Sequence, residues 1–178
     1  MFDVINIQHY TSPCGGLLLG AYNGQLCMCD WLTEKHHARV MSRLQRLLCA
    51  EITETADPVL REAATQLEEY FAGRRMVFNI PLLFVGTEFQ KQVWQALQNI
   101  PYGTTISYAD LAKHIVNPKA VRAVANTNGA NAISIFVPCH RVIGIDGSLT
   151  GYAGGQEAKL YLLNMEQNTI HKNLLANV

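Results

Sequence analysis

The chain has 178 residues and no formal net charge at pH 7, with 49% hydrophobic and 16% charged residues. This composition excludes a disordered chain, and the length suffices for one large domain or two small ones. No apolar run approaches the roughly 20 residues that a membrane span requires, and the N-terminus lacks the pattern of a signal peptide. The five cysteines lack the spacing of a disulfide scaffold, so we expect free thiols in a reducing cytoplasm.

The charged residues are distributed unevenly along the chain. Residues 1–86 carry 7 Lys and Arg against 9 Asp and Glu, whereas residues 87–178 carry 7 against 5. A neutral total argues against a broad phosphate-binding surface. Any contact with nucleic acid is therefore expected in the second half, through few phosphates.

The first residues predict a small sheet. Residues 3–7 alternate polar and apolar side chains, as a half-buried strand does. Asn23-Gly24 is a hairpin signal between strands expected at residues 16–22 and 25–32. Within the second of these strands, alternation predicts one buried and one exposed thiol for Cys27 and Cys29.

Two helices are expected to cover this sheet. One spans residues 34–49 and is predicted to bury its apolar face: Val40, Met41, Leu44, Leu47 and Leu48. The other begins at Asp57-Pro58 and runs to about Ala72. Residues 76–79 are expected to return to the sheet, and residues 81–86 form a candidate linker. His36, His37 and His171 are predicted at the surface.

Helix signals dominate the second half. Residues 87–90 form a capping box, which begins a helix that ends before Pro101. Ser107 begins a second helix that runs to about Ile115, and Asn117-Pro118 begins a third that runs through Ala125. Two short helices joined by a tight turn are typical of a helix-turn-helix. The Asp146-Gly147 hairpin signal between residues 141–145 and 148–150 predicts a wing, and a last helix is expected over residues 156–167.

The third of these helices has few groups that could read base edges. Its small-residue face carries one long cation, Arg122, beside Ala120, Val121, Ala123 and Val124. Helices that read the major groove usually display Arg, Asn or Gln. A small face with one Arg suits the minor groove and an enzyme that flips a base without reading its neighbours. Periodicity alone favours the alternative, burial of this face in a helical bundle.

The run Val137-Pro138-Cys139-His140-Arg141-Val142 carries the clearest chemical signal. A thiol becomes a nucleophile as a thiolate, and an adjacent base that takes its proton generates one. Pro138 fixes the backbone just before the thiol. A buried cysteine beside a surface histidine is the commoner explanation of an isolated pair of this kind.

Together with Pro118-Lys119-Ala120-Val121-Arg122-Ala123-Val124, this run resembles the O6-alkylguanine-DNA alkyltransferase family. The similarity is strongest over residues 87–166, continues weakly from Ser12-Pro13 to Leu26, and includes further segments: Phe89 to Trp94, Ile100 to Gly103, Ser107-Tyr108 and Gly151 to Gly155. It implies an α/β (α+β) fold with a ribonuclease H-like domain over residues 1–86 and a winged helix-turn-helix domain over residues 87–178. It also implies direct-reversal repair, an irreversible, stoichiometric transfer of an alkyl group from DNA to the protein.

The resemblance implies a role for each matching residue of the reaction. Cys139 would accept the alkyl group from guanine O6, and possible substrates include O4-alkylthymine. His140 would act as base through a water and Glu166 would orient it, the triad logic in thiol form. Tyr108 would protonate the leaving guanine, and Asn131 would join the DNA-reading helix to the thiol. Each role has an alternative: a core tyrosine for Tyr108, a solvated carboxylate for Glu166 and a turn residue for Asn131. Without the resemblance, we would expect a solvated Glu166.

The resemblance also implies the DNA contacts and the pocket. Arg122 would fill the space of the flipped nucleotide, and the surrounding contacts to the minor groove of double-stranded DNA would come from Lys119, Ala120, Val121, Ala123 and Tyr108. The pocket would be formed by Val142, Tyr152, Ala153, Gly154 and Lys159, although a solvated Lys159 is an alternative. Ala153 replaces a serine that contacts guanine O6 in some members. We expect a monomer.

No cofactor is implied, and no metal is predicted. Some members of the family bind zinc through N-terminal Cys and His residues, but Cys14, Cys27 and Cys29 do not reproduce that ligand set, and Tyr22 falls at one ligand position. Two other functions stay open. A damage-binding alkyltransferase-like protein would lack the acceptor that Cys139 supplies. A thiol hydrolase or transferase for small molecules would need an oxyanion hole and no Arg122.

Overall fold

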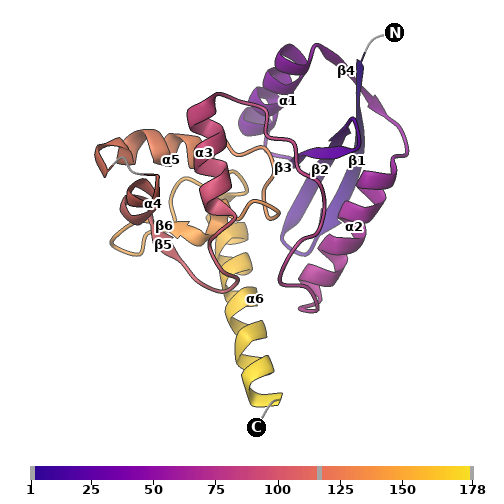
Figure 1. Cartoon of the computed structure of the whole chain (residues 1–178). Helices are drawn as coiled ribbons and strands as arrows, with labels where there is room; N and C mark the ends of the chain where they lie inside the picture. The colour runs from indigo at the N-terminus through magenta and orange to yellow at the C-terminus, as the bar shows by residue number, and fades with distance from the viewer. Residues whose placement is uncertain (1–2, 116–117, 177–178) are drawn as a thin grey trace.

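The computed structural model describes residues 3–115 and 118–176, and its N-terminal half is built on a sheet (Figure 1). The sheet order is β3-β2-β1-β4. Its strands are β1 (Asp3–Ser12), β2 (Gly15–Tyr22), β3 (Gln25–Trp31) and β4 (Ala50–Glu54). β1, β2 and β3 form an antiparallel meander, and β4 pairs with β1 in parallel.

The predicted hairpin is confirmed. Asn23 and Gly24 have φ angles of 49° and 76°, the left-handed values that this turn requires. The prediction of one buried and one exposed thiol in β3 is wrong, because Cys27 and Cys29 are 1% and 0% exposed. β3 lies inside the molecule rather than at its surface, so both of its faces are covered.

Helices α1 (Glu34–Leu48) and α2 (Pro58–Phe71) confirm the two predicted helices of this half. The Asp57 side chain accepts from the backbone N–H of Val59 at 2.8 Å, as the cap prediction requires. α1 buries less of its apolar face than predicted, since Leu47 is 46% exposed. The expectation of a surface position for His36 is also wrong: its side chain is 19% exposed and contacts buried Asp30.

Residues 76–79 form no strand, contrary to the prediction. The place beside β1 is taken by β4, which follows directly after α1. The Gln66 side chain instead holds this segment, donating to the Asn79 carbonyl at 2.8 Å and accepting from its N–H at 2.9 Å. The candidate linker at residues 81–86 is ordered against β3, where Leu26 exchanges backbone hydrogen bonds with Pro81 and Leu83. The domain division at residue 86 stays a prediction.

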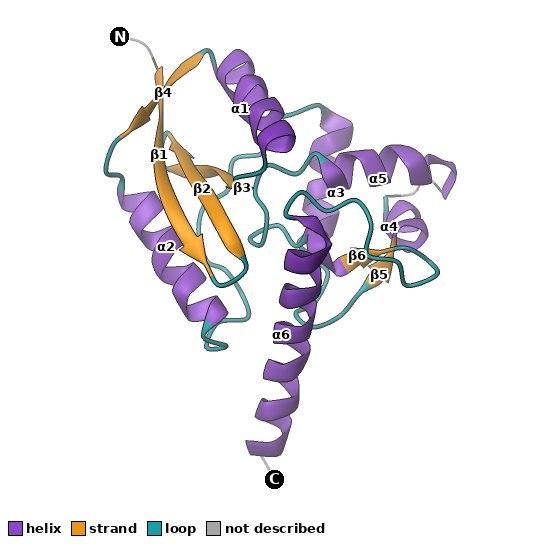
Figure 2. Ribbon diagram, turned by 180° about the vertical axis from the view of Figure 1, so that it is seen from behind, coloured by secondary structure: helices purple, strands orange, loops and turns teal. Residues whose placement is uncertain are grey.

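The C-terminal half is mainly helical, as predicted. Its helices are α3 (Glu88–Leu97), α4 (Tyr108–His114), the 3-10 turn η1 (Pro118–Ala120), α5 (Val121–Gly129) and α6 (Gly155–Ala176). The capping box at Thr87 is present with both of its hydrogen bonds. The predicted cap Asn117 lies outside the described residues, and η1 rather than α-helix follows it. α6 is longer than the predicted 156–167 and extends beyond the rest of the chain (Figures 1 and 2).

The predicted wing forms a turn without its second strand. Gly144 N–H donates to the Ser148 carbonyl at 2.9 Å, and Gly147 has a φ of 81°. The strand before the turn, β6 (Val142–Ile143), pairs in parallel with β5 (Ile106–Ser107) instead. Residues 148–150 form no strand. β5 therefore takes the pairing that the wing prediction assigned to residues 148–150.

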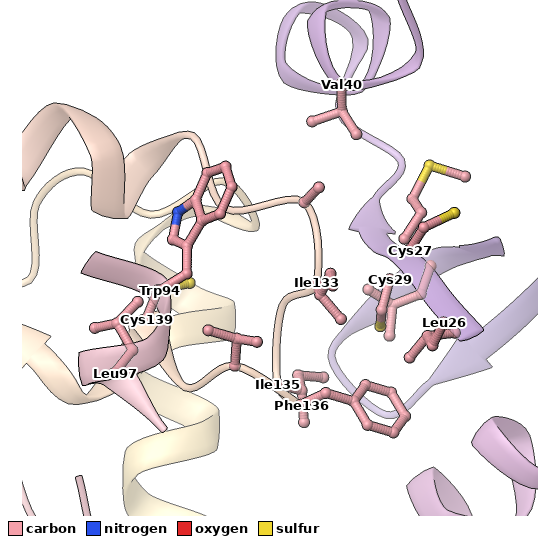
Figure 3. Packing of buried hydrophobic residues seen from close by; sticks show 14 of the residues in the cluster. Leu26, Cys27, Cys29, Val40, Trp94, Leu97, Ile133, Ile135, Phe136 and Cys139 are labelled. Atoms are coloured by element: carbon pink, nitrogen blue, oxygen red, sulfur yellow. The ribbon is translucent and has the colours of Figure 1, made fainter. Parts of the chain in front are cut away.

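The core continues from the sheet into the helical half. Ile133, Ile135 and Phe136 form the middle of this continuous core (Figure 3). On one side of them lie Cys29 and its neighbours on β3. On the other side lie Trp94, Leu97 and Cys139. Cys29 exchanges backbone hydrogen bonds with Ala132 and Ser134 at 2.8 Å each, so this segment extends the edge of β3. Within the described residues, no helix is long and apolar enough to span a membrane.

Candidate active site at Cys139

Cys139 lies at the start of the 3-10 turn η2 (Cys139–Arg141), directly after the segment that packs on β3. Its N–H donates to the Val137 carbonyl at 2.8 Å, and the Arg141 N–H donates to the Pro138 carbonyl at 3.0 Å. These two short turns hold the thiol in place, and Cys139 is 3% exposed. The backbone therefore aims the sulfur into the interior of the site, as the position of Pro138 predicts.

Asn131 contacts the thiol directly. Its Nδ2 lies 3.1 Å from Cys139 Sγ and 2.9 Å from the Val137 carbonyl oxygen, and its Oδ1 accepts from the Ile133 N–H. The structure thus brings Asn131 to the predicted place, between the end of α5 and the thiol. Sequence reasoning missed Asn128, whose Nδ2 donates to the Cys139 carbonyl at 3.4 Å.

The thiol is protonated in the resting site. Burial raises the pKa of Cys139, and this effect outweighs the interactions that lower it: the Asn131 hydrogen bond, the Lys159 charge, the Ser134 hydroxyl and the backbone of Cys139 itself. A thiol with a raised pKa is a weak nucleophile at neutral pH. Nucleophilic attack from this site therefore needs a base that removes the proton.

His140 is placed and tuned to be that base. Its Nε2 lies 2.8 Å from Glu166 Oε1, and both side chains are fully buried. Because a carboxylate oxygen can only accept, Nε2 carries the proton and Nδ1 keeps its lone pair. Burial lowers the pKa of His140 despite the carboxylate, so the ring is neutral at pH 7. Nδ1 is buried and has no hydrogen-bond partner among the described residues.

Glu166 is the centre of a buried network that sequence reasoning saw only in part. Besides His140, it accepts from Tyr70 Oη at 2.7 Å, the Gly103 N–H at 2.9 Å and two guanidinium nitrogens of Arg141 at 2.9 Å each. Burial alone would raise the pKa of Glu166, but His140 and Arg141 hold it far below its usual range. Arg141 belongs to the motif around the thiol and could have been suspected, whereas Tyr70 on α2 has no local signal.

Lys159 is a buried cation beside the thiol, so the solvated alternative is wrong. It is fully buried, and its Nζ donates to the Val142 carbonyl at 2.6 Å. Nζ lies 6.0 Å from the ring centroids of both Tyr108 and Tyr152, within cation–π range. The structure therefore brings four predicted residues together around one site: Lys159, Val142, Tyr108 and Tyr152.

Each of the two tyrosines is held by a hydrogen bond to a different part of the chain. Tyr108 Oη donates to the Thr150 carbonyl at 3.1 Å, and burial raises the pKa of this phenol. Tyr152 Oη accepts from Trp31 Nε1 at 3.1 Å, and its ring meets the His140 ring edge-on at 6.4 Å. Trp31, which sequence reasoning missed, lies at the end of β3 and joins the sheet to the site.

Two predicted pocket residues contact the sheet half of the chain. A Cβ at Gly154 would lie 2.7 Å from the Trp31 ring, so close packing requires glycine here. The Ala153 carbonyl accepts from Thr33 Oγ1 at 3.1 Å. These contacts fix the loop that carries Tyr152.

Except for Tyr108 on α4, the predicted DNA-contacting residues lie in η1 and the first turn of α5. Lys119, Arg122 and Ala123 are exposed, and Ala120 and Val121 are half-buried. Val124, which the sequence grouped with this face, is fully buried in the core. The surface is therefore smaller than predicted, with one turn of small residues around two cations. α5 packs against both α3 and α4.

Among the described residues, no group of three or more His, Cys, Asp or Glu side chains is arranged to hold a metal ion. The site therefore has a thiol, a base, a carboxylate, a phenol and a buried cation as its chemical groups.

Two family models match the chain. The ribonuclease-like domain of 6-O-methylguanine DNA methyltransferase matches residues 6–84, and the DNA-binding domain of the same family matches residues 88–168. A methylated-DNA–protein-cysteine methyltransferase of Methanosarcina barkeri is 43% identical over 95% of this chain and 98% of its own. The constitutive enzyme of that name in Bacillus subtilis is 58% identical over 62% of this chain and 67% of its own. The crystal structure of Mycobacterium tuberculosis OGT in complex with DNA superposes with a TM-score of 0.79 at 40% identity, covering 92% and 94% of the two chains.

Proposed function

Because the chain belongs to the 6-O-methylguanine DNA methyltransferase family, it is a methylated-DNA–protein-cysteine methyltransferase that repairs alkylated DNA directly, and we propose that Cys139 accepts the alkyl group. The observation that carries this proposal is the buried pair of His140, which directly follows the thiol in the chain, and Glu166 of α6. It supplies the base that a protonated thiol requires.

The reaction begins with removal of the Cys139 proton. The free lone pair of His140 Nδ1 takes this proton through a bridging water, and Glu166 stabilises the imidazolium that forms. Lys159 and Asn131 stabilise the thiolate by charge and by hydrogen bond. The thiolate is thus formed in a buried site whose groups already stabilise its charge.

The thiolate then attacks the alkyl carbon on guanine O6. The C–S bond forms while the C–O bond breaks, and the bonding electron pair leaves with the guanine oxygen. Tyr108 supplies a proton to the departing base, because its raised pKa keeps the phenol protonated until then. The thioether product is a poor leaving group, so each molecule reacts once.

We propose that the substrate nucleotide is flipped out of double-stranded DNA from the minor-groove side, with α4 and α5 acting as a helix-turn-helix. The exposed small residues at the start of α5 permit close approach, and Arg122 fills the space left in the base stack. The DNA-bound Mycobacterium tuberculosis relative supports DNA as the partner. We also propose a monomer that acts in the cytoplasm, where its free cysteines stay reduced.

The test is the intact mass of the protein after incubation with a duplex that carries O6-methylguanine, followed by peptide mapping. We expect one added methyl group per molecule, located on Cys139. Cys49→Ala is the matched control, because Cys49 is an exposed thiol and its loss should leave the gain unchanged. Tight binding without a mass gain would instead identify a damage-binding protein. No binding and no gain would point to thiol chemistry on small molecules.

A further inference from the structure

A second buried carboxylate lies outside the network around Glu166. Asp30, near the end of β3, is fully buried, and its Oδ1 lies 2.9 Å from His36 Nδ1. His37 Nδ1 lies 3.4 Å from the other carboxylate oxygen. A buried carboxylate is retained in proteins only with such partners. The proposed reaction gives this cluster no role.

The second ring nitrogen of His36, Nε2, contacts the C-terminal end of α5, the helix that we propose faces DNA. His36 Nε2 lies 2.7 Å from the carbonyl oxygen of Gly129, the last residue of α5. Both ring nitrogens therefore face oxygen atoms that only accept. A neutral imidazole has one N–H and can satisfy one of them, whereas the imidazolium satisfies both. This geometry therefore favours the imidazolium form of His36.

Arg43 of α1 makes a parallel contact to the same helix end. Its guanidinium donates to the Ala130 carbonyl at 2.9 Å and lies 5.3 Å from the Trp94 ring centroid. α5 has no basic residue in its own last turn. Two cations of the sheet half thus occupy the negative end of the α5 dipole, where such charges are favourable.

The capped helix end leads directly to the thiol. Asn131 follows Ala130, and its side chain contacts Cys139 Sγ at 3.1 Å. We propose that His36, held by Asp30, is a positioning residue that, as an imidazolium, fixes the end of α5 and thereby places Asn131 against the thiol. This inference rests on the proposed function of Cys139 as the alkyl acceptor. It links the protonation of a residue in the sheet half to transfer in the helical half.

The charges around His36 set the direction of its pH dependence. Burial and the Arg43 charge lower the pKa of His36, but Asp30 and the Gly129 carbonyl outweigh them and raise it. His37 and the buried thiol of Cys29 also face the cluster, both through Asp30. A raised folded-state pKa means that the cap is fully present below the usual histidine pKa and is lost as pH rises through the raised value. Alkyl transfer should then slow in mildly alkaline solution, although the thiol ionises more readily there.

The experiment measures single-turnover alkyl transfer from duplex DNA to the protein from about pH 6 to about pH 9, which spans the usual histidine pKa and the alkaline side on which a raised one titrates. We expect the wild-type rate to fall at the alkaline end. His36→Gln, which keeps an N–H donor that does not titrate, should lose this fall. His36→Leu should transfer about tenfold more slowly even at the low end, because a charged hydrogen bond is lost. His171→Gln, an exposed histidine on α6, is the matched control.

An NMR titration of the full chain provides a readout independent of transfer. The His36 ring and the Asn131 side-chain amide should titrate together, and Asp30→Asn should lower the pKa that both report. A level transfer rate while His36 titrates, or a wild-type rate in His36→Leu, would overturn the proposal. Absence of transfer in the wild type at every pH would instead refute the proposed function, and the coupled NMR titration would still test the cap.

Discussion

Replacing Glu166 with glutamine should separate the structural and chemical roles of the buried network. The carboxylate accepts hydrogen bonds from Tyr70, Gly103, His140 and Arg141, and the Arg141 side chain is 7% exposed. A glutamine amide offers one oxygen and turns an NH2 group toward the remaining donors. Glu166→Gln therefore leaves the guanidinium of Arg141 buried without its counter-charge.

The expected cost is large for a chain of this size. Removing one partner of a buried ion pair costs about 3–5 kcal/mol, whereas domains are stable by only about 5–15 kcal/mol. Urea unfolding followed by circular dichroism should show a loss of about 3–5 kcal/mol for Glu166→Gln. Glu157→Gln, exposed in the first turn of α6, is the matched control and should lose at most about 1 kcal/mol.

The direction of the acid dependence follows from the depressed pKa of Glu166. Its stabilising effect is present above the usual glutamate pKa and is lost as pH falls toward the folded-state value. The stability difference between wild type and Glu166→Gln should therefore shrink in acid. A constant difference down to about pH 3 would contradict the ionised carboxylate, because its protonated form would then be equally stabilising.

A double variant tests whether the network also serves the reaction. Glu166→Gln combined with Arg141→Met removes both buried charges, so most of the lost stability should return. Alkyl transfer should stay impaired, because His140 still lacks the carboxylate that orients its ring. A Glu166→Gln variant within about 1 kcal/mol of wild type, or a double variant with the wild-type rate, would refute the reasoning.

Two further substitutions test the surface and the thiol. Arg122→Ala should slow repair of duplex DNA by about tenfold or more while leaving reaction with free O6-benzylguanine nearly unchanged, and equal slowing of both would exclude the stack-filling role. Lys159→Met should raise the pKa of Cys139 further, because a buried cation beside the thiolate is lost. Its alkylation by iodoacetamide at neutral pH should then be about tenfold slower, with Lys172→Met, an exposed position on the same helix, at the wild-type rate.

Local signals predicted local structure well in this chain. The Asp57 cap, the Thr87 capping box and the Asn23-Gly24 turn each occur where expected, because their hydrogen bonds or φ angles depend on residues a few positions apart. The same proximity made the thiol and its neighbouring base visible in the sequence. Such features need no knowledge of what packs against them.

The errors in the sheet and in the site concern contacts between distant parts of the chain. β4 rather than residues 76–79 completes the sheet, since strand pairing depends on which segment reaches β1. Cys27 and Cys29 are both buried because distant segments cover β3. For the same reason Tyr70 and Trp31, which are 96 and 121 residues from their hydrogen-bond partners, could not be assigned to the site.

Burial of the thiol explains how a protein that reacts only once can protect its acceptor cysteine from side reactions. In the proposed reaction Cys139 is consumed, so a thiolate open to solvent would be lost to stray electrophiles and oxidants. Burial keeps its pKa raised, while Asn131 and Lys159 stand close enough to stabilise the anion once it forms. His140 is neutral and ready to accept the proton, since burial lowers its pKa. The groups that would ionise the thiol are therefore already in place around it, and in our proposal the Asp30–His36 cap holds the helix end on which that arrangement depends.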